Sequence, residues 1–252
     1  MIRKQSEGIH WIEFELLADT KALAHGVFLR QGGVSEGPFA SLDMGGRVQG
    51  STPAQVAENR ARVQKILQVS HLHSACQKHG TTVVYIEKPM QQPPLADALM
   101  TAQAGEALMV KHADCQAAIF FDPIQKAIAT VHCGWRGNVH NIYAVTLLEM
   151  REKMGVHLEN VLVGISPSLG PEKAEFIHYR EEFPESFWPY QVKPYHFDLW
   201  AIARMQLEEA GILPHHIEIA SLCTYSHPED FFSYRRDNKM TGNHATIAML
   251  KI

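Results

Sequence analysis

The residues with the most chemical potential lie between Ala113 and Gly137, in the stretch ADCQAAIFFDPIQKAIATVHCGWRG. Two apolar runs, AAIFF and AIATV, flank the sequence DPIQ, which suits a type I turn. A hairpin centred between Pro123 and Ile124 places Cys115 opposite His132. Facing residues of an antiparallel pair lie on one side of the sheet with their Cβ atoms about 5 Å apart. The pattern therefore predicts a thiol and an imidazole close enough to share a metal ion or exchange a proton.

The residues after this hairpin could bind an anion. Side chains alternate along a strand, so Cys133 should point away from Cys115 and His132. The sequence GWRG, which contains Arg136, then leads into a helix, and glycines and a helix start both favour an anionic ligand. In the alternative interpretation, Cys115 is a small buried hydrophobe and His132 caps a loop. One cysteine and one histidine do not complete a zinc pattern, so a further donor must come from elsewhere.

Further candidates lie in loops. His79 follows in CQKHG, just before an apolar strand, and Asp114 is either a proton acceptor or a cap at the start of a strand. The long glycine-punctuated loop GGVSEGPFASLDMGGRV is typical of segments that line a pocket. The candidate substrate contacts are Asp43, Arg47, Arg136, Arg235 and Arg236.

Helices and strands alternate irregularly along the chain. The spacing of apolar residues, together with capping residues, predicts three amphipathic helices, at residues 51–68, 138–155 and 198–211. Short apolar runs bounded by turn residues predict strands at 81–86, 106–110, 117–121, 127–131, 160–165 and 217–222, with a last strand near the C-terminus. Hairpins and crossovers together indicate layers of α and β structure rather than a purely parallel sheet.

Composition is that of an ordinary globular protein of 252 residues, with 46% hydrophobic and 20% charged residues. No linker divides the chain, so we expect a single domain over residues 1–252. The net charge of −4 gives no reason to expect nucleic acid, and no apolar run is long enough for a membrane span. The N-terminal residues lack the apolar core of a signal peptide, so we expect a cytoplasmic protein with four free thiols and an oligomeric state left open.

Several motifs together resemble the laccase-domain family, also called multicopper polyphenol oxidoreductases. They are HGVFLRQGGVSEGPFASLDMG, AENR, QKHG, ADALMT, ADCQAAIFFDP, VHCGWRG, GPEKAEF and CTYSHPEDFFSYRRDNKMTG, and they extend from about His25 to the C-terminus. Family members have been described as purine nucleoside phosphorylases with adenosine deaminase activity and as peptidoglycan editing factors. The resemblance implies an α+β fold, a layered α/β/β/α sandwich with mixed sheets.

The resemblance also implies a metal site and a substrate. It assigns His79, Cys115 and His132 as ligands, and two nitrogens with one thiolate leave a fourth position open, as in catalytic zinc sites. Zinc there would activate water for attack at C6 of adenine. In phosphorolysis, phosphate instead attacks ribose C1′ and needs a cationic pocket. The implied substrates are thus a purine nucleoside and phosphate.

Several positions depart from the family pattern, among them Cys133, Gly50, Ser51 and Lys173. Lys78 replaces a usual apolar residue and Arg47 a frequent histidine, while Asn243 and His244 replace arginine and methionine in the TGRM segment. These departures bear on substrate preference more than on metal binding.

Other function classes use the same residues. A cytoplasmic hydrolase that edits peptidoglycan precursors would use Cys115 as nucleophile and His132 as base, with any metal incidental. Copper-dependent polyphenol oxidation needs several clustered metal sites, whereas the sequence indicates one cluster. A non-catalytic binding protein is the remaining class.

Overall fold

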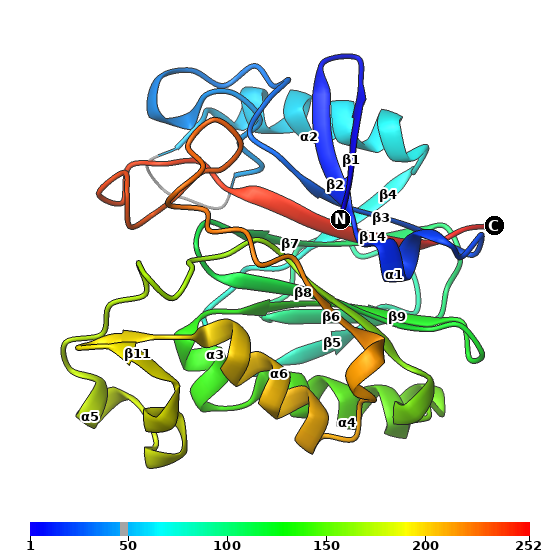
Figure 1. Ribbon diagram of the computed structural model, residues 1–252. Coiled ribbons are helices and arrows are strands. Elements are labelled where there is room, and N and C mark those ends of the chain that lie inside the picture. The colour runs from blue at the N-terminus through cyan, green and yellow to red at the C-terminus, as the bar shows by residue number, and fades with distance from the viewer. Residues whose placement is uncertain (46–49) are drawn as a thin grey trace.

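Two six-stranded sheets lie face to face in the computed structural model, which describes residues 1–45 and 50–252. Helices cover the outer side of each sheet (Figure 1). The first sheet has the order β1 (Ile2–Ser6), β2 (Ile9–Glu13), β3 (Leu23–Phe28), β14 (His244–Leu250), β7 (Glu106–His112) and β4 (His71–Ser74). The second has the order β13 (Ile217–Ile219), β10 (Leu162–Ile165), β8 (Gln116–Asp122), β9 (Ala127–Cys133), β6 (Ala98–Thr101) and β5 (Val83–Tyr85).

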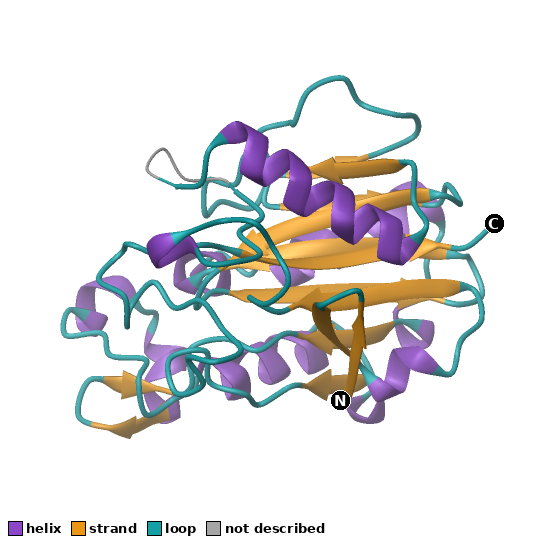
Figure 2. Ribbon diagram, turned by 90° about the horizontal axis from the view of Figure 1, so that it is seen from above, coloured by secondary structure: helices purple, strands orange, loops and turns teal. Residues whose placement is uncertain are grey.

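Both sheets mix parallel and antiparallel neighbours. The pairs β4–β7, β5–β6 and β10–β13 are parallel, and the other pairs within the two sheets are antiparallel. The helix α2 (Pro53–Leu67) crosses the outer face of the first sheet (Figure 2), while α4 (Ile142–Met154) and α6 (Leu199–Glu209) cover the second. The α+β sandwich of α/β/β/α layers with mixed sheets is therefore confirmed.

The described residues form four apolar cores: one between the sheets, one beneath the helices on each side, and a smaller one built from residues between 169 and 202. Strand β8 shows how the sequence produces this arrangement. All seven of its residues are buried, with Ile119 and Phe121 in the core between the sheets and Phe120 in the core beneath α4. A strand covered on both faces reads as a continuous apolar run, and the sequence AAIFF has that form.

The predicted helices form where capping residues allow. Thr52 caps α2 by accepting the N–H of Gln55, and Asp198 caps α6 in the same way. The prediction of one helix over 138–155 was wrong, because α3 (Trp135–Val139) ends before α4 begins. Asn141 between them has φ 51° and its side chain caps the second helix. In the described part of the chain no helix is long and apolar enough to cross a membrane.

Smaller elements complete the chain. They are α1 (Glu15–Ala18), α5 (Tyr179–Glu182), the two-stranded β11 (Gln191–Lys193) and β12 (His196–Phe197), and 3-10 turns at Gly37–Phe39, Leu158–Asn160, Glu185–Tyr190 and Pro214–His216.

The hairpin of β8 and β9 exists, but its predicted register was wrong by two residues. His132 pairs with Ala117, not with Cys115, which lies just before the start of β8. A shift of two residues keeps every side chain on its predicted face, whereas a shift of one would reverse them all. Cys115 and His132 therefore still approach each other, although they are not directly opposed.

The connection between the strands explains the shift. Asp122 pairs with Ala127, so four residues lie between the paired ends instead of two. The Asp122 carboxylate accepts the N–H groups of Ile124 and Gln125 at 2.8 and 3.0 Å, and Lys126 adopts a positive φ of 51°. A side chain that hydrogen-bonds to the backbone in this way lengthens the turn.

Strand directions bring three loop segments and the end of one strand together at one end of the second sheet. Strands β6 and β8 both run antiparallel to β9, and β5 runs parallel to β6. The starts of β5, β6 and β8 thus meet at the end of β9. His79 precedes β5, Asp97 precedes β6 and Cys115 precedes β8. His132 is the second-last residue of β9.

Candidate metal centre

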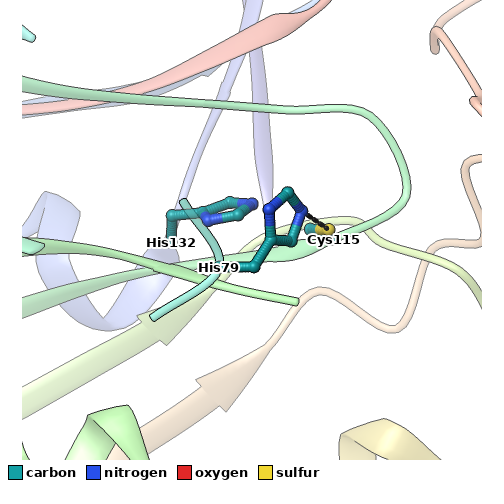
Figure 3. Close-up of side chains that lie close together, drawn as sticks. All are labelled: His79, Cys115 and His132. Carbon is teal, nitrogen blue, oxygen red and sulfur yellow. Dashed lines mark hydrogen bonds between the residues drawn. The ribbon is translucent and has the colours of Figure 1, made fainter. Parts of the chain in front are cut away.

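Three donor side chains converge at this end of the second sheet (Figure 3). The ligand atoms of His79, Cys115 and His132 all lie within 4.8 Å of one another. The Cys115 sulfur is 3.8 Å from Nε2 of His79, and the two imidazole rings are 4.8 Å apart between centroids at an angle of 82°. The structure thus brings together the three residues that the resemblance assigned to a metal.

The donor set fits a zinc ion. Tetrahedral zinc with bonds of about 2.3 Å to sulfur and about 2.0 Å to nitrogen separates S and N ligands by roughly 3.5 Å and two N ligands by roughly 3.3 Å. The 3.8 Å separation between Cys115 and His79 is already close to that value. Small rotations of the side chains would close the remaining gap, and three protein donors leave a fourth position for water or substrate.

Asp97 is a site residue that the sequence reasoning missed. Its buried carboxylate lies 2.9 Å from Nδ1 of His132, which leaves Nε2 of that ring as the ligand atom. The same carboxylate accepts the backbone N–H groups of Lys78, His79 and Gly80 at 3.1, 2.9 and 2.8 Å. A carboxylate behind a histidine ligand fixes the ring tautomer and orientation. The signal was available, since an acidic residue stands directly before a buried strand in ADALMT.

Local packing positions the other two donors. His79 has a positive φ of 59°, and its loop is tied to β7 by Gln77, whose side chain exchanges two hydrogen bonds with the backbone of Lys111. Gly134 lies against both donors. A Cβ atom there would be 2.8 Å from the His79 ring and 3.1 Å from the Cys115 sulfur. The glycine of GWRG is therefore required for close approach.

The site favours a thiolate beside an imidazolium when no metal is bound. Burial by itself would raise the pKa of Cys115, but the charge of His132 and hydrogen bonds from both histidines outweigh burial and lower the pKa. Burial would lower the pKa of His132, yet the Cys115 thiolate and Asp97 raise it. Cys133, buried among apolar side chains on the other face, has its pKa raised by burial. Only the first of these thiols has the character of a ligand or nucleophile.

A cleft of about 1020 Å³ opens above the donors. Among the predicted residues, Asp114, Arg136 and Arg235 line it together with the three donors. Asp43 and Arg236 do not line this cleft, and Arg47 lies outside the described residues.

Two predicted arginines present their side chains differently. The exposed guanidinium of Arg136 stacks on the ring of Trp135, 4.1 Å from its centroid, and this contact holds its orientation. The guanidinium of Arg235 donates to the backbone carbonyls of Lys173 and Glu175. Arg136 is therefore the better placed of the two for a bidentate contact to an anion.

Asp114 and Arg236 hold loops together. The Asp114 carboxylate accepts the hydroxyl hydrogen of Thr224 and the backbone N–H of Arg235, each at 2.6 Å. Burial raises its pKa, and these hydrogen bonds oppose the shift. Arg236 makes an ion pair with Asp237 and donates to the carbonyls of residues 224, 225 and 231.

Asp43 organises the first loop in a similar way. Its carboxylate accepts the N–H groups of Gly45 and Asn243 and the hydroxyl hydrogen of Ser51. The bond from Asn243 connects the loop to the residue that directly precedes the first residue of β14, His244.

The fold and site together define a class of protein: a two-sheet sandwich with a cluster of three side chains that could hold a metal ion at the end of one sheet, beside a cleft with an excess of cationic side chains. The chain belongs to the family described as multi-copper polyphenol oxidoreductase laccase, which matches residues 24–251.

Relatives support this assignment along nearly the whole chain. A purine nucleoside phosphorylase of Bacteroides thetaiotaomicron is 32% identical over 246 residues, covering 88% of this chain and 90% of that protein. The purine nucleoside phosphorylase YlmD of Geobacillus stearothermophilus is 32% identical over 260 residues, covering 94% and 93%. The crystal structure of YlmD superposes with a TM-score of 0.89 at 26% identity, covering 99% of this chain and 98% of the other. The Bacillus licheniformis protein YfiH gives 0.86 at 26% identity, covering 99% of each chain.

Proposed function

We propose that this chain is a zinc-dependent purine nucleoside phosphorylase with adenosine deaminase activity. The observation that carries the proposal is the convergence of His79, Cys115 and His132 at the floor of a cleft that also contains Arg136. A purine nucleoside needs a concave pocket and inorganic phosphate needs a cation, and the cleft offers both. The names of the relatives support the same substrate class.

The side chains divide the work as follows. Arg136, held by Trp135, binds phosphate beside C1′ of the ribose, with Arg235 as a further candidate contact. Asp97 keeps Nε2 of His132 directed at the donor cluster. Zinc, when bound by the three donors, supplies a Lewis acid and lowers the pKa of water, as deamination at C6 requires. The role of Asp114 as a proton acceptor stays a prediction.

Product analysis tests both activities at once. Purified protein of known zinc content is incubated with adenosine and phosphate, and adenine, inosine and hypoxanthine are separated by chromatography. Adenine reports phosphorolysis and inosine reports deamination. Cys115→Ala should abolish both, whereas Cys76→Ala, at an exposed cysteine that lines the cleft outside the donor cluster, should retain them. Zinc-loaded protein that forms neither product would refute the proposal.

One observation favours a second function, a cysteine hydrolase acting on a peptidoglycan precursor. The charge of His132 and hydrogen bonds from both histidines outweigh burial and leave the pKa of Cys115 below its ordinary value, as an activated nucleophile requires. Chelation separates the two functions, because a zinc reaction stops when the metal is removed and a thiol nucleophile keeps its activity. Copper-dependent phenol oxidation uses several neighbouring metal sites, whereas the described residues bring together one such donor group.

A further inference from the structure

The cleft carries more positive charge than inorganic phosphate alone requires. Three carboxylates line it, and five cationic side chains do so as well, namely Lys78, Lys111, Arg136, Arg235 and Lys239. This local excess occurs in a chain whose net charge is −4. An excess of one sign of charge in a cleft concentrates ligands of the opposite sign.

Not all of these cations are engaged by the protein itself. Lys111 donates its ammonium group to the carbonyl of Ala75, and Arg235 donates to backbone carbonyls. Within residues 1–45 and 50–252, the side chains of Lys78, Arg136 and Lys239 make no hydrogen bond or ion pair, and Arg136 only stacks on Trp135. These cations are available to a ligand.

Two of the available cations flank the donor cluster. Lys78 is exposed and directly precedes His79, and its backbone is fixed by the hydrogen bond to Asp97. Arg136 is two residues after Gly134, and Gly134 lies against His79 and Cys115. One of the two suffices for the attacking phosphate. The other lines the same cleft and makes no ion pair within the described residues.

The volume of the cleft also exceeds the need of a nucleoside. Its 1020 Å³ lies at the upper end of the roughly 300–1,000 Å³ typical of pockets for drug-sized ligands. There is room for inorganic phosphate and for a substrate with an additional charged group.

We propose that the preferred substrate carries its own phosphate: a purine nucleoside 5′-monophosphate, selected by Lys78, with Arg136 left for inorganic phosphate. This inference rests on the proposed phosphorolysis. The bond between purine N9 and ribose C1′ breaks, and a bond between C1′ and an oxygen of inorganic phosphate forms. The electron pair stays on the purine, which takes up a proton, so AMP and phosphate give adenine and ribose 1,5-bisphosphate.

Steady-state kinetics with AMP and adenosine test this preference. We expect kcat/KM for AMP to exceed that for adenosine by about tenfold to hundredfold, the range for a hydrogen bond to a charged group. Lys78→Met, which keeps the length but removes the charge, should erase the difference, and Lys78→Arg should restore most of it. Lys21→Met changes an exposed lysine that does not line the cleft and should retain the preference. Added salt should reduce the advantage of AMP, since Lys78 is exposed.

Steady-state kinetics, combined with titration calorimetry of AMP and of adenosine, separate the possible failures. Equal kcat/KM for AMP and adenosine, or a preference that survives Lys78→Met, overturns the role of Lys78 and leaves phosphorolysis intact. A Lys78→Met variant with a higher KM for inorganic phosphate on both substrates assigns this side chain to inorganic phosphate and overturns the inference. Tighter binding of AMP than of adenosine, lost in Lys78→Met but with no turnover of either, supports the inference and refutes phosphorolysis.

Discussion

Replacing Asp97 by Asn should weaken zinc binding more than any other change outside the three ligands. Oδ1 of Asp97 faces His132 Nδ1 and the His79 N–H, and Oδ2 accepts the N–H groups of Lys78 and Gly80. An asparagine places an NH2 group at one of these two positions. Whichever position it takes, two donors lose their acceptor, and the Asp97 side chain itself is almost fully buried.

The magnitude follows from those lost acceptors. A buried donor left unsatisfied costs about 1–3 kcal/mol, so two of them lower the free energy of unfolding by about 2–6 kcal/mol. His132 can recover one bond by accepting from the new NH2 group through Nδ1. Its proton then occupies Nε2, and the ring no longer presents a free nitrogen to zinc. Loss of such an outer-shell carboxylate typically costs about 10–100-fold in metal affinity.

The assay is a zinc titration against a competing chelator, combined with urea unfolding of the metal-free protein. Asp122→Asn is the matched control, because Asp122 is fully buried and accepts two backbone N–H groups in the hairpin turn but does not line the cleft. Both N–H groups bond to Oδ1, and Oδ2 has no hydrogen-bond partner among the described residues, so the asparagine keeps both bonds and the control should retain its zinc affinity. An Asp97→Asn protein that binds zinc as tightly as the wild type would refute the positioning role of Asp97.

Three further predictions follow from individual side chains. Cys115→Ser should weaken zinc binding, measured by the same titration, by more than the roughly 10–100-fold of an outer-shell change, because a hydroxyl replaces the thiolate. Gly134→Ala should reduce zinc affinity about tenfold without changing the urea midpoint. The new Cβ would lie only 2.8 Å from the His79 ring and would push that ring aside. Burial lowers the pKa of His25 from 6.5 to about 4. Between these two pH values the unfolded state therefore binds more protons than the folded state. Stability should therefore fall by about 3 kcal/mol as the pH falls from 6.5 to 4. His25→Gln, which can still accept the Phe14 N–H, should lack this loss in urea unfolding at each pH.

The sequence predicted the helical and strand segments whose signals are local. Thr52, Asp198 and Gly155 end or begin helices as expected, because caps act through the nearest few residues. The N-terminal strands β1, β2 and β3 were not predicted, and their pairing with β14 joins residues at opposite ends of the chain. Such pairings have no local signature.

The site shows the same division between local and distant signals. Cys115 and His132 could be related from the hairpin alone, because a register error of two residues preserves the face. His79 was a loop candidate from the sequence, but only the family resemblance joined it to Cys115 and His132, since no spacing rule connects the loop before β5 to this hairpin. Asp97 was missed because its role depends on β6 pairing with β9, which places it beside His132.

Asp97 also bears on whether Cys115 acts as a metal ligand or as a nucleophile. A thiol nucleophile needs one imidazole as its base, and Asp97 could support His132 in that role. The carboxylate, however, also fixes the backbone of His79, whose Nε2 lies 3.8 Å from the Cys115 sulfur. A single buried group thus positions two imidazoles around one thiolate. The second imidazole is superfluous for a nucleophile and its base but necessary for a three-donor centre, so the arrangement favours the metal.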